Sequence, residues 1–162
     1  MTRRSEEHRA EEEPMTTVTV PDELLTIEDW DALEETDANR RWQLADGLVA
    51  VAPFPSLDHQ EIVTNLTIWL REHLPADVRA IPGVAVTIEA GFPPTVRGPD
   101  VTVLVRARPR TNVLRVDPAD VRLVAEFVSP GSRRLDRVTK VSEYQDVGIP
   151  LTLDVGALLT LD

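Results

Sequence analysis

Two short apolar runs in the second half of the chain, residues 101–105 and 121–128, most constrain how it can fold. Each run is too short for a buried helix and is bounded by turn-forming residues, so the pattern predicts two buried β-strands. A carboxylate, Asp100, comes directly before the first run, and Glu126 lies within the second. Burying a carboxylate is costly unless it is paired, protonated or bound to a metal, so these two residues need an explanation.

Helical spacing is found on both sides of the two runs. Three helices are predicted, over residues 26–35, 56–74 and 133–147. The first opens on a sequence that resembles a capping box, and the second on Ser56, a suitable N-cap. In the second helix, the apolar set is Ile62, Leu66, Trp69, Leu70 and Leu74. In the third, it is Val138, Val141 and Tyr144.

The remaining segments have the pattern of strands. Residues 39–51 predict a hairpin around an Asp-Gly turn. We place Trp42, Leu44, Leu48 and Ala50 on one of its faces and Val49 and Val51 on the other. Residues 84–90 predict another strand, and residues 151–162 one strand or a broken pair. The order of elements predicts an α/β fold with a mixed central sheet flanked by helices.

Composition excludes several kinds of site. The chain of 162 residues has no cysteine, which excludes disulfides and thiolate chemistry, and three histidines are too few for a His-rich metal centre. No apolar run reaches the length of a membrane span, and the N-terminus lacks the apolar core of a signal peptide. We therefore expect a cytoplasmic protein, with a disordered acidic leader over residues 1–16 and a single domain over residues 17–162.

Charge is distributed unevenly along the chain. The net charge is −11, yet residues 97–140 carry ten basic and five acidic side chains. The overall balance argues against a dedicated nucleic-acid binder, while the basic segment permits a polyanionic substrate. Any binding of nucleic acid is therefore expected to be weak and sensitive to salt.

Lys140 is the only lysine among 17 basic residues. Such a bias is typical of a GC-rich genome, which places arginine wherever a positive charge suffices. A position that stays lysine indicates a need for a compact ammonium that can give up its proton. The neighbours of Lys140 favour this functional interpretation over a chance position, although Lys140 could also simply pair with Asp136 four residues earlier.

Asp100, Glu126 and Lys140 together can form a hydrolytic site. Two neighbouring carboxylates repel each other, and Mg²⁺ or Mn²⁺ relieves that repulsion. Lys140 would then act on the attacking water or stabilise the transition state. Other interpretations remain open: Asp100 as a turn residue, and Glu126 as the partner of Arg122 in an ion pair. His59, in the first turn of the second helix, fits a surface or capping residue better than a site residue.

Residues from about 26 to 150 resemble the Uma2 family, a group of bacterial proteins with the PD-(D/E)XK restriction-endonuclease-like fold. The matching landmarks are Arg41-Trp-Gln-Leu-Ala-Asp-Gly47, Pro53 with His59, Pro99-Asp100, Glu126-Phe-Val-Ser-Pro130, Asp136-x-x-x-Lys140-x-x-x-Tyr144 and Gly148-Ile-Pro150. Their order and spacing together carry the resemblance.

The resemblance implies roles for three residues. Asp100 and Glu126 would be the metal-binding acids, and Lys140 would be the third catalytic residue, reaching in from the following helix. In most such nucleases the lysine lies two residues after the second acid, where this chain has Val128. The chain also has Gln43 where such sequences often have glutamate, and a C-terminal segment poorer in aromatic residues.

The resemblance implies a Mg²⁺- or Mn²⁺-dependent endonuclease whose substrate is nucleic acid, with DNA expected rather than RNA. No membrane partner is expected, and a homodimer is one possible oligomeric state. Two other classes compete. One is an interaction or regulatory protein that keeps the fold without activity, which Gln43 and the acidic balance favour. The other is a metal-free hydrolase that uses Asp100 and Glu126 as an acid–base pair.

Overall fold

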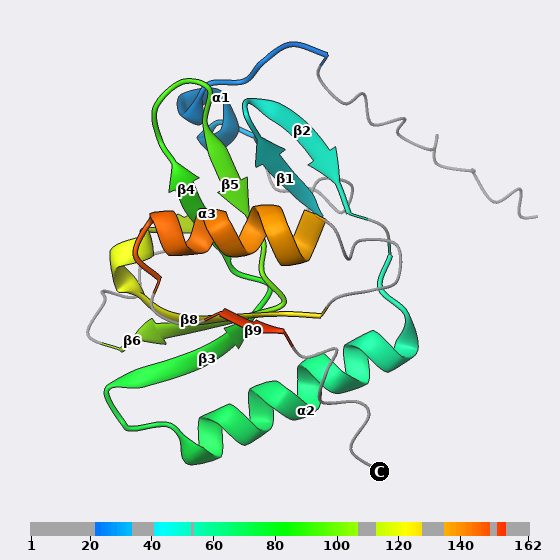
Figure 1. Ribbon diagram of the computed structural model, residues 1–162, viewed down its shortest axis with the longest axis vertical. Coiled ribbons are helices and arrows are strands. Elements are labelled where there is room, and N and C mark those ends of the chain that lie inside the picture. The colour runs from blue at the N-terminus through cyan, green and yellow to red at the C-terminus, as the bar shows by residue number, and fades with distance from the viewer. Residues whose placement is uncertain are drawn as a thin grey trace, which may run out of the picture.

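Strand pairing determines the architecture of the chain. The computed structural model describes residues 22–33, 41–52, 54–106, 113–127, 135–149 and 152–154. Its first sheet contains β1 (Trp42–Ala45), β2 (Leu48–Val51), β4 (Ala85–Glu89), β5 (Thr95–Arg97) and β7 (Arg115–Val116). Its second sheet contains β3 (Val78–Pro82), β6 (Val101–Val105), β8 (Val121–Glu126) and β9 (Thr152–Asp154). The strand orders are β2-β1-β5-β4-β7 and β3-β6-β8-β9 (Figure 1).

Helices cover both faces of the second sheet. The helices are α1 (Ile27–Asp31), α2 (Leu57–His73) and α3 (Val141–Asp146), with a 3-10 turn η1 (Pro118–Asp120) and a π-helical stretch η2 (Leu135–Lys140) that runs into α3. Helix α2 runs along the outer face of the second sheet, and α3 lies between the two sheets (Figure 1). The α/β class predicted from the order of elements is confirmed.

The apolar run of β6 is continuous because both of its faces are buried. Val101 and Val103 pack in one cluster with Val63 and Leu70 of α2, whereas Leu104 packs in another with Tyr144 of α3. A strand that lies between two helices needs apolar residues on both sides. The prediction of a buried strand is therefore confirmed, with its physical reason.

The expectation of one central sheet is wrong in detail, since the described strands form two sheets and the chain passes between them five times. One passage, from β3 to β4, turns at Gly83, whose φ is 63°. Another, from β5 to β6, runs through Gly98 and Pro99. The two passages lie together because the Gly83 N–H donates to the Asp100 carbonyl at 3.2 Å. Glycine tolerates the left-handed backbone that such a sharp change of direction requires.

The predicted starts of α1 and α2 are confirmed, but one residue predicted to be buried in α2 is exposed. Thr26 and Asp29 form a capping box at α1, and the Ser56 side chain accepts from the His59 N–H at α2. In α2 the fully buried residues are Val63, Thr67 and Leu70. Trp69, predicted on the apolar face, is 55% exposed and stacks on His73.

The hairpin is confirmed, but its faces are not as predicted. Leu44 pairs with Val49 across the two-residue turn, so Trp42, Leu44 and Val49 share the face that packs with α1. Leu48, predicted beside Leu44, lies on the other face and is 50% exposed. The turn length sets the register, and a shift of one residue exchanges the faces.

The third helix begins with π-helical winding. Val138, predicted on the buried face with Tyr144, is 66% exposed. The wider turns of a π-helix rotate residues 135–140 away from the α-helical spacing assumed for them.

The acidic leader lies outside the described residues, and the single-domain division stays a prediction. Among the helices described, none is long and apolar enough to cross a bilayer.

Candidate active site

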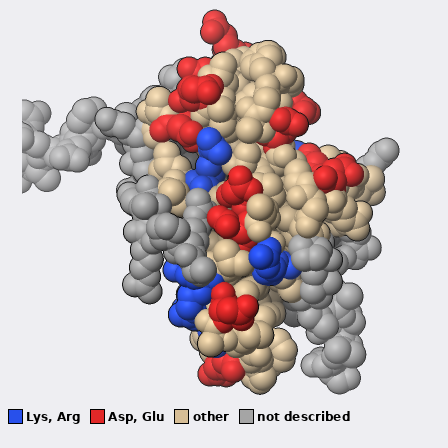
Figure 2. Space-filling view, turned by 90° about the vertical axis from the view of Figure 1, so that its left-hand side faces the viewer, with Lys and Arg blue, Asp and Glu red and all other residues tan. Residues whose placement is uncertain are grey.

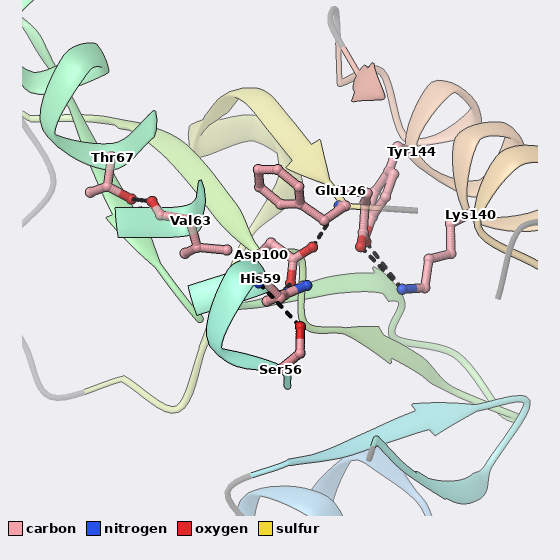
Figure 3. Close-up of polar contacts among 9 residues, drawn as sticks. Ser56, His59, Val63, Thr67, Asp100, Glu126, Lys140 and Tyr144 are labelled. Atoms are coloured by element: carbon pink, nitrogen blue, oxygen red, sulfur yellow. Dashed lines mark hydrogen bonds and ion pairs between the residues drawn. The ribbon is translucent and has the colours of Figure 1, made fainter. Parts of the chain in front are cut away.

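Asp100 and Glu126 come together because their strands are neighbours. Strands β6 and β8 are antiparallel, with Val101 opposite Ala125, so Asp100 lies at the start of β6 beside the end of β8. Figure 3 shows both carboxylates at this edge of the sheet, with His59 approaching from one side and Lys140 and Tyr144 from the other. The site therefore lies where α2, the sheet and α3 meet.

Glu126 is a buried carboxylate with three hydrogen bonds. The Lys140 Nζ lies 3.2 Å from each of its oxygens, and the Tyr144 hydroxyl donates to Oε1 at 2.7 Å. Glu126 is 6% exposed and Lys140 is 8% exposed. Both partners come from the same helical segment, four residues apart, so one turn of helix presents an ammonium and a phenol to one carboxylate.

Burial raises the pKa of Glu126 to about 7. The Lys140 ammonium and the Tyr144 hydroxyl both lower this pKa, while the nearby Asp100 carboxylate raises it further. Desolvation and the like charge thus outweigh the two stabilising partners. At neutral pH a proton competes for this carboxylate with any cation that would bind it. Burial also raises the pKa of Tyr144, which keeps its hydroxyl protonated as a donor.

Asp100 is held from the α2 side. Its Oδ1 lies 3.0 Å from the His59 Nε2, and its Oδ2 accepts from the Phe127 N–H at 2.6 Å. The His59 ring also meets the Phe127 ring edge-on, with 5.4 Å between centroids. These contacts fix the direction of the Asp100 carboxylate and the position of the His59 ring beside it.

A second ion pair fixes α3, the helix that carries Tyr144 and directly follows Lys140, the last residue of η2. Arg97, at the end of β5, donates from Nε and Nη2 to the two Glu143 oxygens at 2.7 and 2.6 Å. Burial alone would lower the pKa of Arg97, but the Glu143 carboxylate raises it above its usual value. The buried guanidinium therefore stays charged and ties the first sheet to α3.

Gln43 lies at the border of this site. Its side chain lies beside Gly98, where an added Cβ would meet the Gln43 amide nitrogen at 3.9 Å. Gly98 is two residues before Asp100. The residue that departs from the resemblance noted in the sequence thus lies beside the loop that leads into Asp100.

The donor set suits a small, hard cation. Mg²⁺ is usually held by one or two carboxylates, with water and substrate phosphate completing its shell. Asp100 and Glu126 supply two carboxylates, and each has lone pairs beyond those its hydrogen bonds use. Within the described ranges, no three His, Asp or Glu side chains gather closely enough to hold an ion by themselves. The residues present therefore fit a cation that keeps several waters.

The structure brings the three predicted site residues into one cluster, and their catalytic role stays a prediction. Arg122, the alternative partner of Glu126, instead donates to the Ala119 carbonyl at 2.9 Å. Sequence reasoning undervalued His59, which is a neighbour of Asp100 and not merely a capping residue. It also assigned Tyr144 only to a helix face. The spacing of Lys140 and Tyr144, four residues apart on the helix that follows the Glu126 strand, is the signal that could have found the pair.

Comparisons with known proteins agree on the fold. A family model described as "Uma2: Putative restriction endonuclease" matches residues 17–155. A crystal structure described as "a putative nuclease belonging to DUF820", from Anabaena variabilis ATCC 29413, has a TM-score of 0.63. It is 17% identical, covers 79% of this chain, and 72% of that chain is covered in return. A search of curated proteins gave no match. The predicted restriction-endonuclease-like fold is confirmed.

Proposed function

Because this chain belongs to the Uma2 family, we propose that it is a metal-dependent endonuclease that hydrolyses phosphodiester bonds of nucleic acid. The observation that carries the proposal is the contact of Lys140 with both oxygens of Glu126, at 3.2 Å, beside Asp100 on the neighbouring strand. Two carboxylates and an ammonium at one sheet edge can supply the metal binding and the charge stabilisation that metal-dependent phosphodiester hydrolysis uses. The description of the solved nuclease supports the same reaction class.

Asp100 and Glu126 would hold Mg²⁺ or Mn²⁺. A divalent cation bound there would lower the pKa of its water and screen the charge that develops on the phosphoryl group. For this role the Glu126 carboxyl must lose its proton, and its pKa of about 7 makes that loss dependent on pH near neutrality. His59 and the Phe127 N–H keep Asp100 aimed at the site while the substrate enters.

Lys140 and Tyr144 would prepare the other side of the site. Tyr144 holds Glu126 in one orientation, because its hydroxyl donates to Oε1 and its ring is fully buried. Lys140 keeps a positive charge within reach of a phosphate beside Glu126. In a site that excludes bulk water, such a charge stabilises the developing negative charge of the transition state more strongly than it would in solution.

The test is cleavage of plasmid and single-stranded DNA with Mg²⁺ or Mn²⁺ present. Wild-type protein is expected to cleave, and Lys140→Ala to lose about a hundred-fold or more in rate, as is typical for loss of a positioned electrostatic group. Lys140→Arg should also be impaired, because a planar guanidinium cannot replace the compact ammonium between Glu126 and the substrate. Arg122→Ala, a basic residue held by backbone carbonyls, is the control and should keep its activity.

Each outcome separates the competing classes. No cleavage by wild type, under either metal and with either substrate, would contradict the proposal and favour an interaction protein. Cleavage of a non-nucleic ester that persists in chelator would favour the metal-free acid–base reaction. Unimpaired cleavage by Lys140→Ala would remove Lys140 from the mechanism while leaving the reaction class intact.

A further inference from the structure

Phe54 is the most exposed large apolar side chain in the described part of the chain, at 83%. Single exposed apolar residues are common and need no explanation. Phe54 differs because a guanidinium is fixed on one face of its ring: the Arg41 Cζ lies 3.6 Å from the ring centroid. A cation over an aromatic face is attracted by the negative charge of the π-system.

The backbone holds Arg41 in this position. Its Nη1 donates to the Ala52 carbonyl at 2.7 Å, and the Ala52 N–H donates back to the Arg41 carbonyl at 3.0 Å. Arg41 and Ala52 thus extend the pairing of β1 with β2 by one residue beyond Trp42 and Val51. The guanidinium is therefore positioned before any partner arrives, and the rest of the ring stays open to solvent.

Phe54 lies just before the N-terminus of α2, the helix that reaches the candidate active site through His59. Phe54 is two residues before Ser56, so their Cα atoms are within about 7 Å of each other. Ser56 caps the turn of α2 that carries His59, and His59 contacts Asp100. Figure 1 shows the segment from β2 to α2 on the same side of the molecule as the end of β8 and the start of α3. Figure 3 shows Ser56 beside His59 and Asp100.

We propose that the Arg41–Phe54 pair is a stacking platform for an unpaired nucleobase of the substrate strand, next to the phosphate that is cleaved. The inference rests on the proposed function. An open aromatic ring accepts any base, because every base has a π-face, and a neighbouring arginine adds attraction for the base and for the backbone phosphates. Within a base-paired duplex both faces of a base are already stacked, so the platform favours single-stranded or locally opened nucleic acid.

The experiment measures binding of a short labelled single-stranded DNA by fluorescence anisotropy, in chelator so that the strand stays intact. A series of strands carries one abasic site, moved along the sequence. Phe54→Ala is expected to bind the complete strand about five-fold to a hundred-fold more weakly than wild type. For wild type, one abasic position should cause a loss of similar size, and Phe54→Ala should be insensitive to that position. Phe54→Trp should bind like wild type.

The control is Phe92→Ala. Phe92 is also exposed, at 66%, but it lies in the loop between β4 and β5, at the far end of the first sheet (Figure 1). This variant should bind every strand as wild type does. Matching thermal unfolding of all variants ensures that folded proteins are compared.

Four results would overturn the platform. If Phe54→Ala binds the complete strand as wild type does, the ring makes no contact with nucleic acid. Phe54→Ala could instead bind every strand more weakly by the same factor, with no abasic position coupled to the substitution. The ring would then contact something other than a base, and a protein-binding surface would be the better interpretation. If wild type cleaves DNA without this coupling, the platform fails and the proposed function stands; if it neither binds nor cleaves, both fail.

Discussion

At the scale of single residues, Glu126 is the group whose chemistry is most changed by the fold. The pKa of its carboxyl is raised from the usual 4.5 to about 7, because burial destabilises the ionised form more than Lys140 and Tyr144 stabilise it. The folded state therefore holds a proton that the unfolded chain releases in the same pH range. A stability profile against pH reports this directly.

The contribution of Glu126 to the free energy of unfolding is expected to fall as pH rises from about 4.5 to about 7. In that window the folded state binds more protons than the unfolded state, so raising pH favours unfolding, by a difference on the order of 2 kcal/mol. Glu126→Gln removes the titrating group, and its unfolding free energy should depend less steeply on pH over the same window. Denaturant unfolding at a series of pH values measures both. Parallel profiles for the two proteins would show that Glu126 titrates normally.

Gln43 gives a second prediction for one residue. Its side chain lies beside Gly98, close to Asp100, at a position where the resemblance leads one to expect glutamate. Gln43→Glu would add a third carboxylate of similar size at the site. We expect tighter binding of Mn²⁺ by calorimetry and a lower melting temperature in chelator, because three carboxylates repel one another until a cation binds. Unchanged Mn²⁺ affinity would place residue 43 outside the metal site.

At the scale of elements, η2 and α3 matter because this continuous helical segment presents two side chains to one carboxylate. The sequence predicted the helix and its end, but not the π-helical stretch that places Lys140, since winding depends on hydrogen bonds that no spacing reveals. It also could not show that Arg97, 46 residues away, would hold the helix through Glu143. Such a pair depends on tertiary structure, which brings the end of β5 beside α3.

Breaking this pair should destabilise the protein. Glu143→Gln leaves the guanidinium of Arg97 buried without its countercharge, at a cost of about 3 kcal/mol. Nuclease activity should fall as well, because α3 then no longer holds Lys140 and Tyr144 in place. The matched control is Asp31→Asn, which removes a bidentate but more exposed partner of Arg115 and should cost about 1 kcal/mol or less. Equal losses in the two variants would show that the Arg97 pair has no special role.

Dependence on tertiary structure also explains which parts of the fold the sequence predicted. The strand of residues 101–105 was predictable because burial on both faces forces a continuous apolar run. The strand within residues 121–128 was predictable because a mainly apolar segment lies between turn-forming residues. The hairpin faces and Val138 were not, since they depend on turn register and on helical winding. His59 was undervalued because its partner, Asp100, lies 41 residues further along the chain. The two carboxylates and Lys140 were predicted from the sequence, whereas the contacts of His59 and Tyr144 with those carboxylates were not.

At the scale of the whole molecule, internal pairing uses part of the basic charge. Of the ten basic residues between 97 and 140, Arg97, Arg115 and Lys140 each contact a carboxylate within the protein. On the face shown in Figure 2, basic and acidic side chains lie interspersed among neutral ones. A homodimer and a cytoplasmic location stay predictions.

Binding of DNA should therefore depend on salt only moderately. Only part of the seven remaining arginines can contact phosphates at one time, so the slope of log K against log salt concentration is expected to be on the order of −2 to −5. Titrations of labelled single-stranded DNA at several salt concentrations, in chelator, give this slope. A much steeper slope would reveal a larger basic surface than the pairing pattern indicates, and tight binding that is independent of salt would contradict an electrostatic contact.

The measurement that tests the central claim most directly is anomalous diffraction from crystals grown with Mn²⁺. If Asp100 and Glu126 hold the cation, a peak is expected between their carboxylates, and crystals of Asp100→Asn should lose it. The metal must displace the proton of Glu126, so the peak should be stronger above pH 7 than below it. An empty site in well-ordered wild-type crystals at high pH and saturating Mn²⁺ would contradict the account.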